Sequence, residues 1–239
     1  MKRPLRVLVA CESSGVVRDA FNALGHVATS CDLLPCEGRH HQGSVFEIIN
    51  QRWDLMICHP PCTYLSSSGM HWTINGYRCP LLTCEAVQFA KLLWSADIPR
   101  IAMENPVGVL STEIQEPDQY IQPYRFGHDA SKGTGLWLKN LSRLKNTKYI
   151  KPRIVNGRKR WGNQTDSGQN ALPPRDGREK ERSKTYDGIA QAMAIQWGGD
   201  TGWRDAAHVD DPESDHCLLF RGELEYRTFH NVLMARPKK

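Results

Sequence analysis

Two residues of this sequence could carry out covalent chemistry together. Cys62 lies in the stretch "ICHPPCTYLSSSG", where an apolar strand runs into two prolines and then a small polar loop. A thiol titrates near pH ~8.5 and its thiolate is a strong nucleophile. Glu104, in "ENP", follows another apolar stretch and supplies a carboxyl group. On a cytosine ring, a thiolate can add to C6 while a protonated carboxyl group donates to N3, and C5 can then accept a methyl group.

The elements that position these residues alternate along the chain. Hydrophobic periodicity predicts strands at Arg6–Ala10, His26–Cys31, 53–58, Arg100–Met103 and 135–141, and helices at 17–24, about 45–49, Thr83–Trp94 and from near Tyr186. Strands that alternate with helices predict an α/β fold with a mostly parallel central sheet. In such sheets ligands bind at the carboxyl ends of the strands. Glu12, Asp32, Cys62 and Glu104 all fall at predicted strand ends.

The turn "CESSG" after the first strand bears on the cofactor. It is neither a G-x-G-x-x-G fingerprint nor a Walker A loop. Its small residues would still let a ligand approach the backbone closely. Asp32, at the end of the second strand, is placed to accept a ribose hydroxyl. These features favour a nucleoside-bearing cofactor bound without a phosphate site, which fits S-adenosylmethionine better than NAD or ATP.

Pro60-Pro61-Cys62 resembles the Pro-Cys motif of the DNA (cytosine-5)-methyltransferases, and Glu104-Asn105-Pro106 resembles their Glu-Asn-Val motif. The resemblance covers about residues 6–140 and, more faintly, 183–197, and it is greatest for compact phage and prophage members. It implies a Rossmann-like S-adenosylmethionine-dependent methyltransferase fold. It also implies methylation of cytosine C5 in DNA through a covalent Cys62 adduct, with S-adenosylmethionine as cofactor and DNA as partner.

The same resemblance assigns roles to individual residues. The catalytic residues are Cys62 and Glu104, with Lys132 or Arg125 standing in for a Gln-x-Arg-x-Arg motif that this sequence lacks. The cofactor-binding residues are Cys11, Glu12, Ser13, Gly15, Asp32, Ser44 and Pro60. The glycine-rich loop of the family keeps only Gly15 here, and Ser44 stands where the family has an acid. We expect His59 to be structural or to face a phosphate rather than to act as a base.

Positive charge is concentrated between Lys151 and Lys184. This segment has ten Lys/Arg against four Asp/Glu, a difference of +6, whereas the whole chain has a net charge of +5. A basic segment rich in Gly, Asn and Gln suits contact with a polyanion, although a solvated loop is the alternative. The predicted DNA-binding residues are Arg158, Lys159, Arg160, Asn163 and Gln164. Trp161 and Tyr149 would either stack on bases or pack internally.

The 239 residues suffice for one good core. We predict a catalytic and cofactor-binding core at 1–150, a basic insert at 151–184, a helix returning to the core at 185–200, and an extension of unknown role at 201–239. No apolar run reaches membrane-spanning length and no signal peptide is recognisable, so we expect a cytoplasmic protein that does not bind membranes.

The cysteines are not expected to form disulfides or a metal site. The eight cysteines contain no Cys-x-x-Cys pair and are expected to be reduced thiols. Cys31, Cys36, His40 and His41 lack a matching second half for zinc, so no metal is expected. Two alternatives to DNA methylation stay open: C5 modification of a free pyrimidine nucleotide, and a catalytically degenerate DNA-binding protein.

Overall fold

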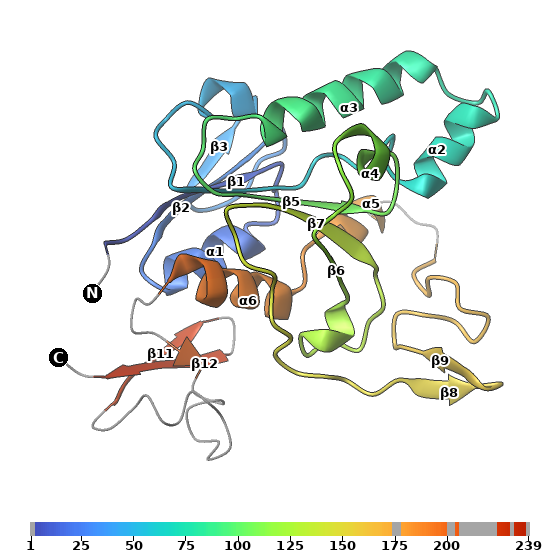
Figure 1. The fold of residues 1–239 in the computed structure, drawn as a ribbon. Coiled ribbons are helices and arrows are strands. Elements are labelled where there is room, and N and C mark those ends of the chain that lie inside the picture. The colour runs from blue at the N-terminus through green and yellow to red at the C-terminus, as the bar shows by residue number, and fades with distance from the viewer. Residues whose placement is uncertain (1–2, 174–177, 200–203, 206–223, 230–231, 238–239) are drawn as a thin grey trace.

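A seven-stranded sheet forms the centre of the computed structural model, which describes residues 3–173, 178–199, 204–205, 224–229 and 232–237. Its strand order is β3-β2-β1-β4-β5-β7-β6 (Figure 1). The strands are β1 (Arg6–Ala10), β2 (Val27–Asp32), β3 (His40–Gln42), β4 (Leu55–Cys58), β5 (Ile101–Pro106), β6 (Gln119–Ile121) and β7 (Thr134–Lys139). Strands β3, β2, β1, β4 and β5 are parallel, while β7 runs antiparallel to both β5 and β6. The expected α/β fold with a mostly parallel sheet is confirmed.

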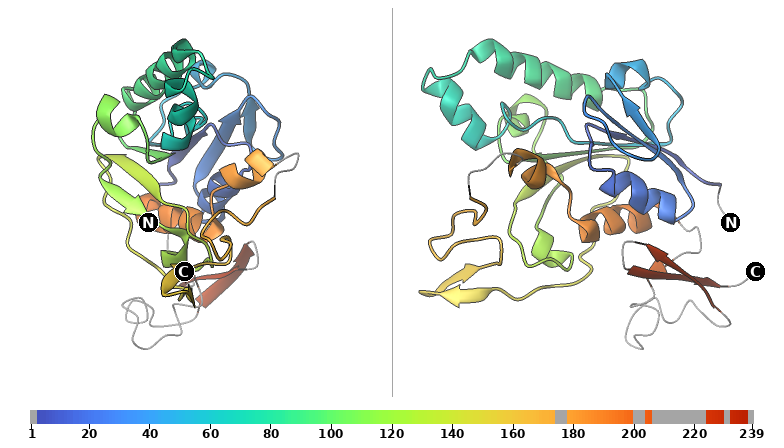
Figure 2. Two further views of the ribbon diagram at one scale, coloured as in Figure 1. Left: turned by 90° about the vertical axis from the view of Figure 1, so that its right-hand side faces the viewer. Right: turned by 180° about the vertical axis from the view of Figure 1, so that it is seen from behind.

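Helices cover both faces of this sheet (Figures 1 and 2). Helices α1 (Val16–Ala23) and α6 (Asp187–Gly198) lie on one face, and α2 (Ser67–Ile74) and α3 (Pro80–Trp94) lie on the other. The shorter helical segments are η1 (Val45–Glu47), α4 (Leu110–Glu113), η2 (Pro123–Arg125) and α5 (Arg178–Ser183). Because the connections between the parallel strands cross over the sheet, both faces are buried and the strand ends are left for ligands.

Successive side chains of a strand point to opposite faces of the sheet and belong to two separate hydrophobic clusters. Val7 and Val9 of β1 pack with Phe21 of α1, whereas Leu8 between them packs with Leu93 of α3. All five are completely buried. Burial of a side chain of this size contributes about 1.5–3 kcal/mol. The continuous apolar run "RVLVA" is therefore explained by a strand that is buried on both faces.

Several boundaries differ from the predicted ones. Strand β5 extends to Pro106, which pairs with Thr134 of β7, so Glu104 lies within the strand rather than after it. The polar stretch after Cys62 is not only a loop, because helix α2 begins at Ser67 with Ser66 as its N-cap. Strands β3 and β6 were not predicted, since each has only three residues and lies at an edge of the sheet, and β3 is also polar.

The basic insert contains a β-hairpin that was also not predicted. Strands β8 (Arg153–Val155) and β9 (Arg158–Arg160) pair antiparallel around Asn156-Gly157. Both turn residues have positive φ, 49° and 73°, as a two-residue hairpin turn requires. The described part of the C-terminal extension forms a three-stranded antiparallel sheet of β10 (Arg204–Asp205), β12 (Val232–Pro237) and β11 (Leu224–Phe229).

Candidate active site

The loop that carries Cys62 is anchored to β5 by a buried amide. Asn105 Nδ2 donates to the carbonyl oxygen of Pro60 at 2.7 Å, and Asn105 is 1% exposed. Breaking a buried hydrogen bond in a way that leaves one partner unpaired costs about 1–3 kcal/mol. The thiol of Cys62 is exposed. The strand that bears Glu104 thus also holds the Pro-Pro-Cys segment in place.

The segment after Cys62 packs tightly against two glycines, Gly69 and Gly108. Ser66 forms a β-bridge with Gly108, just after β5. A Cβ on Gly108 would lie 1.9 Å from the carbonyl oxygen of Leu65, and a Cβ on Gly69 would lie 2.1 Å from that of Thr63. Real side chains do not approach backbone oxygens so closely, so only glycine permits this packing. Close backbone contacts at Gly69 and Gly108 therefore fix the segment that follows Cys62.

Strand register places Glu104 beside His59. Cys58 of β4 pairs with Met103 of β5, so the residues that follow them, His59 and Glu104, are neighbours across the sheet. His59 Nδ1 lies 2.6 Å from Glu104 Oε2, and the two side chains are 15% and 14% exposed. This contact gives Glu104 a fixed partner before any ligand binds.

The charges of this pair depend on its surroundings. Burial alone would raise the pKa of Glu104, but the hydrogen bond and charge of His59, together with the Lys132 ammonium, hold that pKa below its usual value. Burial would lower the pKa of His59, but Glu104 and then Glu12 raise it above its usual value. Glu104 is therefore ionised at neutral pH, and His59 holds the shared proton on Nδ1.

Of the two cations proposed to replace the missing motif, the structure brings only Lys132 near this pair. Lys132 acts electrostatically on both His59 and Glu104, and its Nζ donates to the carbonyl oxygen of Arg182 at 3.0 Å. Arg125 is exposed and lies over the ring of Tyr124, 6.0 Å from its centroid. No contact among the described residues connects Arg125 with Cys62 or Glu104.

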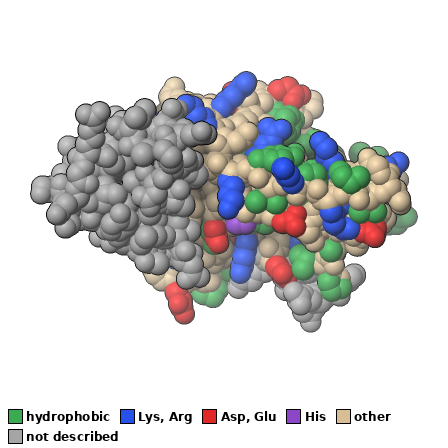
Figure 3. Space-filling view, turned by 90° about the horizontal axis from the view of Figure 1, so that it is seen from below, with side chains coloured by type: hydrophobic (Ala, Val, Ile, Leu, Met, Phe, Trp, Pro, Cys, Tyr) green, Lys and Arg blue, Asp and Glu red, His purple; other side chains and the backbone are tan. Residues whose placement is uncertain are grey.

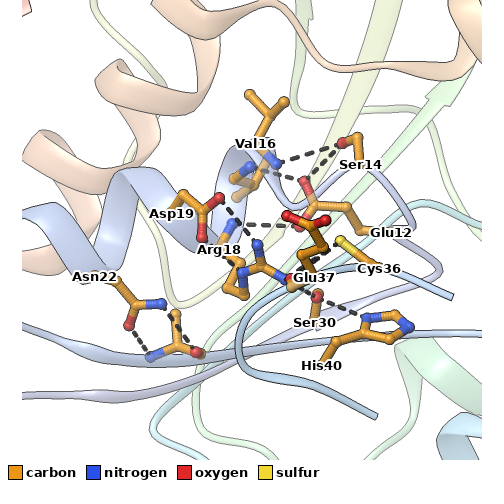
Figure 4. Close-up of polar contacts among 12 residues, drawn as sticks. Glu12, Ser14, Val16, Arg18, Asp19, Asn22, Ser30, Cys36, Glu37 and His40 are labelled. Carbon is orange, nitrogen blue, oxygen red and sulfur yellow. Dashed lines mark hydrogen bonds and ion pairs between the residues drawn. The ribbon is translucent and has the colours of Figure 1, made fainter. Parts of the chain in front are cut away.

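The predicted cofactor turn is stabilised from within by Glu12 (Figure 4). Its carboxylate accepts hydrogen bonds from Val17 N at 2.7 Å, from Arg18 N at 3.3 Å and from Ser14 Oγ at 3.3 Å. The group is 5% exposed, and burial raises its pKa. Both oxygens serve amides at the beginning of α1, where an acid is favoured. The geometry thus assigns Glu12 to the shape of the turn.

Arg18 connects this turn with the loop after β2 (Figure 4). Its guanidinium pairs with Asp19 and also donates to Ser30 Oγ at 3.0 Å and to the carbonyl oxygen of Glu37 at 2.7 Å. Gly15, at φ 72°, packs so closely that a Cβ there would lie 2.3 Å from Arg18 Nη2. The one glycine that the turn retains is therefore required both by backbone conformation and by this guanidinium.

The other predicted cofactor residues surround the same edge of the sheet. Asp32 ends β2, and its Oδ1 accepts from Leu34 N at 2.9 Å, while no partner for Oδ2 is found in the described part of the chain. Ser44 is the N-cap of η1, so its hydroxyl is engaged in a capping box with Glu47. Cys11 has a positive φ of 60° directly after β1.

Tight backbone contacts join these strand ends. Glu12 N donates to Cys31 O at 3.1 Å, and His59 N donates to Ala10 O at 3.0 Å. The ends of β1, β2 and β4 are therefore held together where Ser13, Pro60 and the other predicted cofactor residues lie. The shared edge that the sequence predicted exists in the structure.

Exposure distinguishes Cys62 from the other thiols at this edge. Burial raises the pKa of Cys11 to about 12, and burial raises the pKa of Cys58 well above its usual value, so both stay protonated at neutral pH. Cys31 is buried as well. The seven described cysteines are unpaired, and Cys217 lies outside the described residues. Among the strand-end thiols, Cys62 alone is exposed.

The structure divides the predicted DNA-binding residues into two groups. Arg158 and Lys159 are exposed, and within the described chain no partner contacts their side chains. Arg160 instead donates to the carbonyl oxygens of Asp166 and Ser167. Figure 3 shows Lys and Arg side chains scattered among hydrophobic ones on the face seen from below.

Asn163 and Gln164 make internal hydrogen bonds. Asn163 exchanges two of them with the backbone of Ser131, at 2.9 and 3.0 Å. Gln164 Oε1 accepts from Trp161 N at 3.2 Å. Asn163 therefore holds the insert to the segment before β7 and is not open to read base edges in this conformation, whereas Gln164 bonds within the insert through its side-chain oxygen.

Trp161 of the insert is packed internally, whereas Tyr149, just before the insert, is 54% exposed. Trp161 stacks on Tyr124 of η2 at a centroid distance of 4.2 Å and an interplanar angle of 13°, and it is 8% exposed. Tyr149 packs edge-on against the other side of this cluster, with its ring 5.8 Å from that of Tyr124. Of the two alternatives for Trp161, internal packing is the one that the structure shows.

The described residues show no metal site and no membrane-spanning helix, and a cavity lies outside the predicted site. Within the described ranges, no cluster of three or more His, Cys, Asp or Glu is arranged to hold a metal ion, and no helix is long and apolar enough to cross a bilayer. A cavity of about 240 Å³ opens near the amino ends of β1 and β2, lined by Arg6, Val27, Thr29, Arg39, His41, Ile48, Gln51 and Trp53. It lies away from the edge that carries Cys62, and none of the predicted site residues lines it.

Sequence reasoning missed the anchoring residues. Asn105 and Gly108 were part of or close to the Glu-Asn-Pro motif, but no motif signals a hydrogen bond to Pro60 or a close approach to Leu65. The pairing of His59 with Glu104 had a usable signal, because both residues follow neighbouring predicted strands. Equivalent positions of adjacent parallel strands lie side by side.

No family model and no curated protein matches the sequence. Solved structures that match include a DNA modification methyltransferase encoded within an E. coli prophage, with 14% identity over 56% of this chain and a TM-score of 0.39. The Entamoeba histolytica methyltransferase EhMeth matches with 15% identity over 63% of this chain and a TM-score of 0.43. The S. pombe Dnmt2 methyltransferase matches with 14% identity over 59% and a TM-score of 0.38.

The chain spans about half the length of the solved structures that it matches. It covers 46%, 59% and 51% of the length of these three structures. All three TM-scores lie below 0.5, so the fold class rests on the strand order of this chain and its function rests on the geometry of its own residues.

Proposed function

We propose that this protein methylates cytosine C5 in DNA through a covalent adduct with Cys62 and uses S-adenosylmethionine as the methyl donor. The observation that carries the proposal is the attachment of the Cys62 loop to the strand of Glu104. Asn105 bonds to Pro60, and Ser66 bridges to Gly108. An exposed nucleophile and a buried carboxylate are thereby held in one fixed relation. Such preorganisation is the main contribution that a protein makes to a group-transfer site.

The residues would act on the ring as follows. Cys62 Sγ forms a bond to C6, and the electron pair of the C5–C6 double bond shifts to C5. Because Glu104 is ionised, the proton at N3 would come from solvent as the base binds, rather than from a protonated Glu104. The carboxylate would accept the hydrogen bond from N3–H and so stabilise the electron density that moves toward N3, and Lys132 adds positive charge nearby. The electron pair on C5 would form the new bond to the methyl group. Solvent, which reaches the exposed Cys62, would then take the C5 proton; the electron pair of that C–H bond re-forms the C5–C6 double bond as the C6–S bond breaks and its pair returns to Cys62 Sγ.

The residues at the strand edge fit the cofactor. S-adenosylmethionine supplies an electrophilic methyl group on a sulfonium centre. Asp32 Oδ2, which has no partner within the described chain, would accept from a ribose hydroxyl. Gly15 lets Arg18 pack against the turn after β1 and so helps to hold its shape. Cys11, Ser13 and Pro60 would line the same site. We propose that Glu12 and Ser44 shape it, since their side chains are engaged in caps.

Replacement of Asp32 by alanine is expected to weaken cofactor binding about 10- to 100-fold, because a hydrogen bond to a charged group contributes about 1.5–3 kcal/mol. Titration calorimetry with S-adenosylmethionine measures this loss. Asp32→Asn is the matched variant, because its oxygen still accepts from Leu34 N while an amide nitrogen replaces Oδ2, so it should also lose the ribose contact without disturbing the turn. Wild-type cofactor affinity in Asp32→Ala would exclude Asp32 from the cofactor site.

A duplex target requires that its cytosine leave the base stack while the protein holds the flanking backbone. The hairpin of β8 and β9 presents Arg158 and Lys159 as exposed cations for this purpose. We propose that these two residues contact phosphates. Arg160, Asn163 and Gln164 would support them by holding the insert in shape.

The double variant Arg158→Ala with Lys159→Ala is expected to weaken DNA binding and to flatten its salt dependence. The log–log slope should fall by about 0.9 for each phosphate contact that is lost. DNA affinity is measured across a salt series. Arg39→Ala with Arg52→Ala removes the same charge near β3, at the opposite edge of the sheet, and should leave the slope unchanged. Equal slopes in all three proteins would remove the hairpin from the DNA interface.

Incubation with methyl-labelled cofactor tests the activity itself. The substrates are duplex DNA, single-stranded DNA and free deoxycytidine nucleotides, each digested and analysed for 5-methylcytosine. Label in cytosine of DNA, absent with Cys62→Ser, is the expected result. Label only in the free nucleotide would favour the nucleotide alternative. DNA binding without label in any substrate would favour a catalytically degenerate protein.

A further inference from the structure

His59 is surrounded by charges from three elements. Glu104 of β5 accepts its hydrogen bond, Glu12 after β1 acts on it from the cofactor turn, and Lys132 before β7 lies near both partners of the pair. The Nε2 atom of His59 is buried and has no partner among the described residues. The imidazole thus has one strong contact, with Glu104, and that contact uses Nδ1.

This hydrogen bond determines what Glu104 can offer to a ligand. An ionised carboxylate accepts hydrogen bonds and donates none, whereas a protonated carboxyl group does both. Nδ1 lies 2.6 Å from Oε2, a short contact for a nitrogen donor. The hydrogen bond from Nδ1–H and the charge of His59 hold the pKa of Glu104 below its usual value, so both carboxylate oxygens act as acceptors.

An obligate acceptor discriminates between pyrimidines. The Watson–Crick edge of cytosine carries an amino group at C4, which donates, and an N3 atom that becomes a donor when it is protonated. Uracil and thymine donate from N3–H but carry a carbonyl oxygen at C4, which would face the carboxylate with like partial charge. Only cytosine with a protonated N3 offers a donor at both positions. A protonated carboxyl group would satisfy either edge, because it offers one donor and one acceptor.

We propose that His59 is a specificity-determining positioning residue, which acts through Glu104 to admit cytosine and to exclude uracil and thymine. This inference rests on the proposed function. A site whose buried polar groups must be paired rejects a mismatched ligand far more strongly than a merely apolar pocket does. Both side chains of this pair are largely buried, so their polar groups must be paired when a ligand binds.

The pair can be tested apart from catalysis. Nitrogen-15 NMR of the histidine side chains should show a proton on His59 Nδ1 and a His59 pKa above the usual value near ~6.5. The raised pKa should be lost in Glu104→Gln, whose amide oxygen can still accept from Nδ1 but carries no charge. A His59 that titrates normally in the wild-type protein, or titrates identically in both proteins, overturns the pair and the inference with it.

Selectivity is tested by trapping. Oligonucleotides with 5-fluorocytosine or 5-fluorouracil at the same position are incubated with protein and S-adenosylmethionine, and covalent adducts are counted. Wild type should trap fluorocytosine almost alone. His59→Ala should raise the fluorouracil share about tenfold for each unit by which the Glu104 pKa increases. His59→Asn, whose amide nitrogen can donate from a position close to Nδ1, should restore the preference.

The outcomes separate the two claims. Wild-type protein that traps neither base overturns the proposed function and this inference together. Trapping by wild type with an unchanged fluorocytosine-to-fluorouracil ratio in His59→Ala overturns the inference alone, because a merely structural role would reduce both adducts equally. If His59→Ala does not fold, His59→Gln gives the same reading, since its longer side chain does not place a donor at the Nδ1 position.

Discussion

Cys62→Ser is expected to abolish methyl transfer. A serine hydroxyl is far less ionised than a thiol at neutral pH, and covalent addition is the step that activates C5. The structure favours Cys62 over the neighbouring thiols because it is exposed, whereas burial keeps Cys11 and Cys58 protonated. The measurement is single-turnover transfer of labelled methyl groups to DNA.

Trapping identifies the thiol directly. DNA that carries 5-fluorocytosine should form a stable adduct, because fluorine cannot leave as a proton, and peptide mapping should place it on Cys62. Cys84→Ser is the matched control, since Cys84 is an exposed thiol on α3 outside the site. Near-normal methylation by Cys62→Ser, or an adduct on another cysteine, would exclude Cys62 as the nucleophile.

Glu104→Gln should lower the single-turnover rate by about 10²- to 10⁴-fold, the usual range for loss of a positioned proton-transfer group. The amide can still accept from His59, so the loop and strand should stay in place. It cannot hold a proton against N3 or balance the positive charge of a protonated ring. Cofactor affinity should therefore change little while the chemical step slows.

Glu113→Gln is the control for this substitution. Glu113 pairs with Lys91 at the surface, and its replacement removes a carboxylate of similar size away from the site. The rate and the cofactor affinity are measured for both variants. A large loss of cofactor binding in Glu104→Gln, with an unchanged chemical rate, would instead make Glu104 a cofactor ligand.

The sequence predicted the parts of the fold that burial determines. The run "RVLVA" is apolar at consecutive positions because β1 is covered on both faces, and the helix at 17–24 showed its buried side at helical spacing. Cys62 and Glu104 could be assigned to one edge because parallel strands share a carboxyl end. These predictions depend only on periodicity and on strand direction.

Other features have no such signature. The edge strand β3, "HHQ", is polar because only one side of it pairs with the sheet, so nothing in its pattern distinguishes it from a loop. The amides of Asn163 and Gln164 suit base edges and backbone groups equally well, and tertiary structure decides that they bond internally. The hairpin is different, since Asn156-Gly157 is a strong turn signal that could have been used.

The packing of Trp161 against Tyr124 has a consequence for how far the protein reaches along a duplex. Together with the two bonds between Asn163 and Ser131, this stacking joins the insert to the segment that precedes β7. The residues that follow the hairpin are therefore attached to the core at two points, so the position of the hairpin relative to the core is restrained. Under the proposed function, the number of base pairs between the phosphates that the hairpin contacts and the flipped cytosine is then constant. The distance from the hairpin to the site would determine which position along the duplex is modified.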